Sequence, residues 1–143
     1  MASSTLQLTV QRIIAILGAV GSISAVVGTR IYGSHLATVQ QAQFPAISIH
    51  LIEGSRRVDQ GGHEVFLMQI DIWFKAEGAN PPTWDDVATL WADVLEALHA
   101  EGNLEGSTLR FFRLTNIGQG PQLYEADTSV LHLPTRWNVR ALV

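Results

Sequence analysis

The segment Val65–Phe74, VFLMQIDIWF, is apolar except at two positions of equal parity, Gln69 and Asp71. Its only charged residue is Asp71, and most of the others are Val, Ile, Phe or Trp, which favour strands. Because successive side chains of a strand point to opposite faces, Gln69 shares a face with Asp71, and the other face is apolar. That apolar face consists of Met68, Ile70, Ile72 and Phe74. The pattern predicts the central strand of a sheet.

Apolar residues recur every three or four positions between Thr5 and Val27, which predicts a first helix. Ser3, Ser4 and Thr5 offer N-cap oxygens, and Gly28 is suited to end the helix. Four small residues of this helix would let another backbone approach closely: Gly18, Gly21, Ser22 and Ala25. Packing of these residues against the protein's own sheet is favoured over a contact with another subunit.

A second helix is predicted over Trp84–Ala100, where leucine, valine and tryptophan form one continuous apolar stripe. Thr83 stands at its N-cap position, and Asp86 takes the place of the usual glutamate of a capping box. Acidic residues at this end also suit the helix dipole.

Three further regions predict strands. Ala46–Glu53 alternates between apolar and polar residues, Ser107–Ile117 contains another strand, and two extended segments, Thr128–Leu133 and Arg136–Val143, end the chain. Those two segments form either two strands or one strand bent at Pro134. The predicted order is α-β-β-α-β-β. We therefore expect one α+β domain over residues 1–143, with a mainly antiparallel four- to five-stranded sheet flanked by two helices.

Two helices on one side of this sheet would leave its other side partly open. Val65, Leu67 and Trp73 would lie there, so we expect a helix, a loop or another subunit to cover them. Asp71 lies on the same side and needs water or a partner. Four arginines on predicted strands could pair with it: Arg110, Arg113, Arg136 and Arg140. An ion pair within the sheet is favoured over a subunit contact.

Composition narrows the classes of function. The formal net charge of −4 argues against a nucleic-acid-binding surface, which normally needs a basic stripe. Cysteine is absent, which excludes disulfides and thiolate metal sites. Ile13–Thr29 carries no charge, but it is shorter than a usual membrane span and contains glycine and serine. We therefore expect no membrane role for it.

No catalytic, cofactor or metal site is predicted. His63-Glu64 begins like the zinc motif HExxH, but Leu67 occupies the position of the second histidine, and the segment precedes a strand instead of lying on a helix. His50 and His132 lie on predicted strands, where hydrogen-bonded structural histidines are favoured. If the chain were a small enzyme or ligand-binding domain, the first candidates would be Asp71, His50 and Arg110.

Four segments occur in a telling order: Gly28–Tyr32 (GTRIY), Phe44–Ile47 (FPAI), Gln69–Trp73 (QIDIW) and Asp127–His132. In this order and spacing they resemble the phage tail-completion family of small tail-terminator proteins, and the resemblance extends from Leu6 to Val143. It implies a structural, non-enzymatic virion protein of the tail or neck, made in the host bacterial cytoplasm. It further implies a hexameric ring that sits on the last ring of the tail tube, stops its polymerisation and docks to the head connector.

The expected partners are therefore other copies of the chain, the tail tube protein and the head-connector or closure protein. No cofactor, membrane or sequence-specific nucleic acid is expected, although DNA can pass through the ring lumen. The candidate residues for a subunit or tube interface are Arg56, Arg57, Asp59, His63, Glu64, Asp71 and Trp73. The alternatives are another neck component, such as a head-closure or connector protein, a tube-like subunit, or a small ligand-binding or enzymatic domain.

Overall fold

The computed structural model describes residues 4–34, 36, 42–55, 64–100, 109, 111–126 and 128–142. The helices are α1 (Thr5–Gly18), α2 (Gly21–Val27) and α3 (Trp84–His99). The strands are β1 (Ile31–Tyr32), β2 (Ala46–Ser55), β3 (Glu64–Lys75), β4 (Phe111–Gln119), β5 (Leu123–Glu125) and β6 (Val130–Leu142). The predicted α+β class is confirmed.

The strands form one six-stranded sheet in the order β1-β2-β3-β6-β4, and β5 pairs with the other end of β6. All pairs are antiparallel except β1 with β2. The predicted central strand is β3, which lies between β2 and β6. The sheet has more strands than predicted because β1 and β5 are only two and three residues long, too short to show an alternating pattern.

The end of the chain forms one long strand, β6, which resolves the alternative that the sequence left open. Pro134 lies inside it and has no N–H to donate. Its carbonyl accepts a hydrogen bond of 2.8 Å from the Gly120 backbone N–H, in the segment between β4 and β5. The backbone nitrogen and carbonyl of a strand residue point to the same side of the strand. The nitrogen of Pro134 therefore faces the segment between β4 and β5, where the strand pairing along β6 is interrupted. A side chain at Gly120 would come within 2.7 Å of the proline ring.

The predicted first helix, 5–27, is wrong in one respect: it is broken into α1 and α2, which meet at an angle of 96°. Val20 adopts an extended conformation, and its carbonyl starts α2 by accepting from Ile23 and Ser24. Gly18 and Gly21 lie on either side of Val20, and glycine favours a helix poorly, so breaking the helix here costs less free energy. The bend lets Ile23 and Val27 reach the core. No single described helix is long and apolar enough to cross a membrane, and α1 with α2 passes that test only as a bent pair.

The small residues of this region face away from the sheet. Gly18, Gly21, Ser22 and Ala25 are all exposed, and a Cβ added at either glycine would meet nothing within 4 Å. The expected close packing of these residues against the protein's own sheet is therefore wrong. The larger residues Ile13 and Leu17 make that contact instead.

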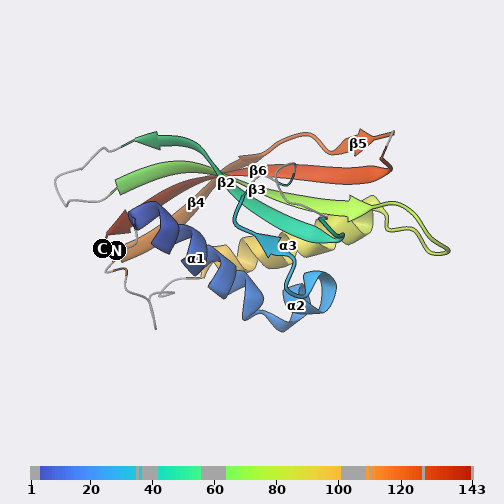
Figure 1. Ribbon diagram of the computed structural model, residues 1–143, viewed down its shortest axis with the longest axis horizontal. Coiled ribbons are helices and arrows are strands. Elements are labelled where there is room, and N and C mark those ends of the chain that lie inside the picture. The colour runs from blue at the N-terminus through green and yellow to red at the C-terminus, as the bar shows by residue number, and fades with distance from the viewer. Residues whose placement is uncertain are drawn as a thin grey trace.

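The three helices lie on one side of the sheet, so the molecule has two layers (Figure 1). The core between the layers joins the apolar stripe of α3 to one face of β2, β3 and β6. The predicted capping box of α3 is confirmed, because the Thr83 N–H donates to Asp86 Oδ2 at 2.7 Å. At α1, Ser4 and Gln7 form a second capping box.

Candidate functional site

The side of the sheet that faces away from the helices is called the open face. On β3 it carries Val65, Leu67, Gln69, Asp71 and Trp73. On the flanking strands it carries Ser48 and His50 of β2, and His132, Arg136 and Arg140 of β6. The predicted division of β3 into an apolar face and a mixed face is confirmed, since Met68, Ile70 and Ile72 are fully buried under the helices.

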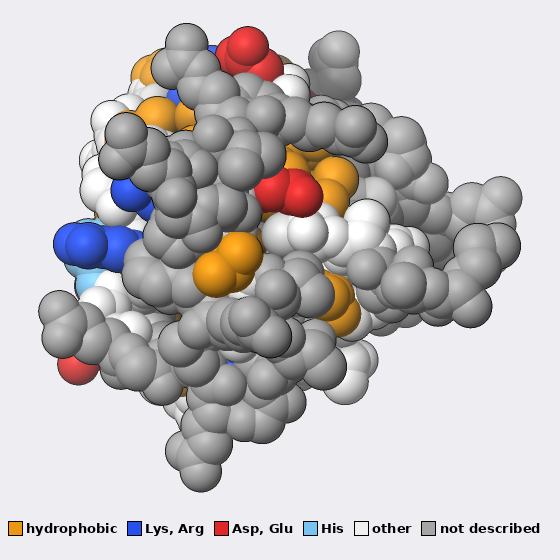
Figure 2. All heavy atoms as spheres, turned by 90° about the vertical axis from the view of Figure 1, so that its left-hand side faces the viewer, with side chains coloured by type: hydrophobic (Ala, Val, Ile, Leu, Met, Phe, Trp, Pro, Cys, Tyr) orange, Lys and Arg blue, Asp and Glu red, His pale blue; other side chains and the backbone are white. Residues whose placement is uncertain are grey.

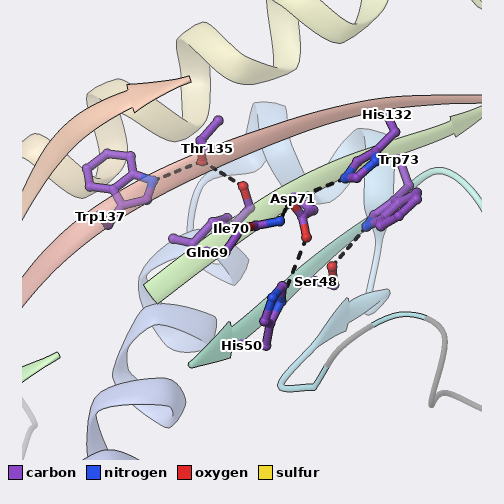
Figure 3. A network of polar contacts seen from close by, with 9 residues as sticks. All are labelled: Ser48, His50, Gln69, Ile70, Asp71, Trp73, His132, Thr135 and Trp137. Carbon is purple, nitrogen blue, oxygen red and sulfur yellow. Dashed lines mark hydrogen bonds and ion pairs between the residues drawn. The ribbon is translucent and has the colours of Figure 1, made fainter. Parts of the chain in front are cut away.

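A buried carboxylate, Asp71, lies at the centre of the open face (Figure 3). Its exposed fraction is only 1%. His132 Nε2 lies 3.3 Å from Asp71 Oδ1, and His50 Nδ1 lies 3.7 Å from Asp71 Oδ2. The Gln69 side-chain amide donates to Oδ1 at 2.8 Å. Three neighbouring strands therefore contribute side chains to one polar group.

The prediction that an arginine pairs with Asp71 is wrong for the arginines that the structure describes. The strand register explains this, because Pro134 of β6 lies directly opposite Asp71, while Arg136 lies opposite Gln69. Arg140 lies still further along β6, opposite Val65, and Arg113 lies one strand beyond it. Arg110 is outside the described residues. Within the described part of the chain, the ionisable side chains beside Asp71 are the histidines His50 and His132.

Trp73 connects this polar group of side chains to a small hydrophobic cluster that is separate from the main core. Its ring stacks on His132, with ring centroids 3.7 Å apart and planes within 7° of parallel. Its Nε1–H donates to Ser48 Oγ at 2.8 Å. Leu36 and Val130 are buried in the same cluster as Trp73, with Phe44 packed against it. The protein's own chain therefore supplies part of the covering that the apolar residues of the open face required.

A second set of side-chain hydrogen bonds lies on the helix-covered side of the same strands. The Thr135 hydroxyl donates to the carbonyl of Ile70 at 2.6 Å and accepts from Trp137 Nε1 at 3.0 Å. Both side chains are fully buried. Trp137 also meets the rings of Trp91 and His99 of α3 edge to face, with centroids 5.9 Å and 5.4 Å away. These contacts fix α3 on the sheet and leave no polar group available to a partner at Thr135.

The structure separates the predicted interface residues into three groups. Asp71 and Trp73 are buried by their own chain. Glu64 is half-buried at the start of β3, where it accepts a hydrogen bond of 3.2 Å from the Thr5 hydroxyl of α1. The remaining four, Arg56, Arg57, Asp59 and His63, lie outside the described residues. The structure thus brings together Asp71 and Trp73, and it places Glu64 on the side of the helices.

Sequence reasoning placed Gln69 on the face of Asp71 and grouped His50 with Asp71 only for an alternative ligand site, and it missed His132 and His50 as the side chains that pack against the carboxylate. The only signal for these contacts is that each side chain lies on the polar face of its own predicted strand. The register that brings the strands together is a tertiary property, so the sequence pattern could not supply it.

The described residues contain no group of three or more His, Asp or Glu side chains that could hold a metal ion. An open cleft of about 750 Å³ lies between residues 42–45, the end of β3 and the start of α3. Its lining includes Phe44, Phe74, Lys75 and Asp86 but neither Asp71 nor His50. Two of the first candidates for a small-molecule site, Asp71 and His50, therefore do not line this cleft, and the third, Arg110, is outside the described residues.

Comparison with known proteins gives the family. A search of curated protein sequences finds no match. A chain in the solved virion of a native gene transfer agent particle has a similar fold, with a TM-score of 0.66, 14% sequence identity and coverage of 98% of each chain. The sequence model of tail completion protein gp17 matches residues 11–140. The resemblance found in the sequence is thus confirmed, and the chain belongs to the tail completion protein gp17 family, with a structural role in the tail or neck of a phage-like virion.

Proposed function

We propose that this chain is a tail terminator, which forms a ring on the end of the tail tube. The ring stops further polymerisation of the tube and presents the surface to which the head connector docks. The observation that carries the proposal is the family match over residues 11–140, nearly the whole of the described fold. The proposed role is structural and involves no catalysis.

The exposed apolar residues support the assembly into a ring. Five large hydrophobic side chains on β2, β4 and β5 are 37% exposed or more: Leu51, Ile52, Ile117, Leu123 and Tyr124. Hydrophobic side chains (orange) also reach the surface at the end of the molecule where β2 ends and β4 begins (Figure 2). Burial of such side chains between neighbouring copies would remove them from water. A closed ring buries them without leaving a free interface that could propagate.

The family resemblance suggests six copies in the ring. The charged residues between β2 and β3, which are Arg56, Arg57, Asp59 and His63, are proposed to contact the tube or the next copy. We assign Asp71 and Trp73 a supporting role, because both are buried and hold β2, β3 and β6 in register.

Mass photometry and negative-stain microscopy of the purified protein, with and without tail tube protein, test the ring. The expected result is a six-fold ring that binds to tube ends. Deletion of the gene tests the terminator role, because loss of a terminator leaves overlong tails. A strict monomer at high concentration with tube protein present would contradict the ring. Free heads with tailless necks after deletion would instead indicate a head-closure protein.

A further inference from the structure

The two edges of the sheet, β2 and β4, each carry a β-bulge with an exposed isoleucine. We infer that, in the proposed ring, the β2 edge of each copy lies along the β4 edge of the next copy. This inference rests on the proposed function, because it assigns the surfaces through which copies of the chain meet. The partner is a second copy of this chain.

Both edges are open over several residues in the described part of the chain. β1 covers β2 only at Ile47 and Ser48, so no described strand pairs with the outer side of β2 from Ile49 to Ser55. β4 ends the sheet on the opposite side. An open strand edge presents backbone N–H and C=O groups that can pair with another strand. One chain therefore offers two different edges, which suits a head-to-tail contact.

Each edge strand contains a β-bulge, and the two bulges lie at the same level of the sheet. The register shift in β2 falls between Leu51 and Glu53, and the shift in β4 falls between Asn116 and Gly118. Leu51 and Asn116 belong to one row, because both connect through Met68 of β3 and Trp137 of β6. The two edges are thus interrupted beside the same row.

The extra residue of each bulge is an exposed isoleucine. Ile52 on β2 is 39% exposed, and Ile117 on β4 is 55% exposed. Bulges on edge strands usually discourage pairing with other chains, and charged residues often help. Here each bulge presents an apolar side chain to the outside. That arrangement is costly for an isolated chain and favourable when the two isoleucines bury each other.

Ring closure brings these two positions together. Successive copies in a closed ring are related by rotation without translation along the axis, so with an axis along the strands, residues at equal levels on opposite edges meet. β2 and β4 run in opposite directions within the chain, because three antiparallel pairings connect them. β2 of one copy and β4 of the next are then antiparallel neighbours, with Ile52 beside Ile117.

Charges on the open face agree with this alignment. Glu53 belongs to the row of Thr115, through Leu67 and Asn138. Arg113 lies two residues from Thr115 on β4 and points to the same face. Diagonal neighbours on adjacent antiparallel strands lie about 7–8 Å apart, within reach of long side chains. The alignment therefore places an acid of one copy beside a base of the next.

The absence of cysteine from the chain permits a direct test by disulfide cross-linking. The double variant Ile52→Cys with Ile117→Cys is expected to form, under mild oxidation, a ladder of covalent multimers up to the closed ring on non-reducing gels. Each single variant is expected to stay without cross-links, because a head-to-tail contact never brings two copies of one position together. The double variant Val26→Cys with Ile117→Cys is the matched control, since Val26 is an exposed residue of helix α2 and does not lie on a strand of the sheet.

The outcomes separate this inference from the proposed function. A ring in the microscope without cross-links in the Ile52→Cys, Ile117→Cys variant would overturn the edge contact and leave the ring proposal intact. Efficient dimers from either single variant would also overturn it, because they indicate a two-fold contact. A monomeric wild-type chain in the presence of tube protein would overturn both proposals.

A charge exchange tests the alignment independently. Glu53→Arg and Arg113→Glu alone are each expected to raise the concentration for half-assembly by about two- to fivefold, and the double variant should restore it. Lys75→Glu serves as the control, because Lys75 lies at the other end of β3 from this contact. Additive losses in the double variant would show that Glu53 and Arg113 do not meet.

Discussion

The helix-covered face and the open face of the sheet use the same strands but differ in how their side chains are held. Under the helices, Ile47, Ile70 and Leu133 belong to a mostly apolar layer in which almost nothing is exposed, and its buried Thr135 hydroxyl is hydrogen-bonded. On the open face, the carboxylate of Asp71 occupies the corresponding central place and is held by side chains from three strands. Alternate residues of β3 thus belong to two different environments.

The difference concerns how specific each contact must be. Apolar burial is non-directional, and a core tolerates changes that conserve volume. The polar cluster depends on individual partners, because a buried polar group that loses its partner is costly. The helix-covered face therefore supplies most of the stability, and the open face fixes which residues of β2, β3 and β6 stand side by side.

The largest expected effect lies on the helix-covered face. Ile72→Ala should reduce the free energy of unfolding by about 2–5 kcal/mol, because a fully buried side chain is lost and a cavity remains. Leu67→Ala on the open face is the matched change, and it should cost less because Leu67 is only half-buried. Urea denaturation of both variants measures the difference. Equal losses would contradict the proposed contrast between the two faces.

Asp71→Ala should have the next largest effect. It leaves the Gln69 amide without its acceptor and removes the shared partner of His50 and His132, so we expect a loss of about 1–3 kcal/mol. Glu96→Ala, on the exposed side of α3, is the control and should change stability by less than about 0.5 kcal/mol. Denaturation curves for the two variants that coincide would show that the Asp71 cluster contributes nothing to stability.

The elements that sequence reasoning predicted well are those whose pattern is local and long. Alternation along β3 and the apolar stripe and capping box of α3 both appear in the structure as expected. The break at Val20 was missed because the spacing of apolar residues continues across it, while the turn between α1 and α2 depends on what the sheet offers for burial. β1 and β5 were missed because they exist only by pairing with longer strands.

The candidate site was less predictable for a related reason. The need of Asp71 for a partner follows from its position on a strand, but the identity of the partner depends on register between strands distant in sequence. Because Pro134 lies opposite Asp71, Arg136 lies opposite Gln69 instead, and His132 lies beside the carboxylate. Register is a property of the assembled sheet. The matching bulges at Ile52 and Ile117 also depend on the register between strands, so the sequence pattern does not reveal them.

A smaller effect is expected where Trp73 meets Ser48. Trp73→Phe keeps an aromatic ring against His132 but removes the 2.8 Å hydrogen bond to Ser48, which should cost about 0.5–1.5 kcal/mol. Ser48→Ala removes the same bond from its other end. In a double-mutant cycle, the second change should then cost less than it does alone. Strict additivity of the two changes would show that the hydrogen bond carries no stability.

The smallest effect on folding should come from the exposed isoleucines of the two edges. Ile52→Ser and Ile117→Ser each remove a side chain that is only partly buried, with 39% and 55% exposed, so the free energy of unfolding of the isolated chain should fall by no more than about 1 kcal/mol. Assembly should respond in the opposite way, because each change removes apolar area that only a neighbouring copy buries. Mass photometry across a dilution series should therefore show the ring of either variant dissociating at higher concentration than the wild type. Val26→Ser on α2 removes a comparably exposed apolar residue and should leave both measurements unchanged. If all three variants assemble alike, the exposed residues of the sheet edges are ordinary surface, and the contrast between the interior of the sheet and its edges is lost.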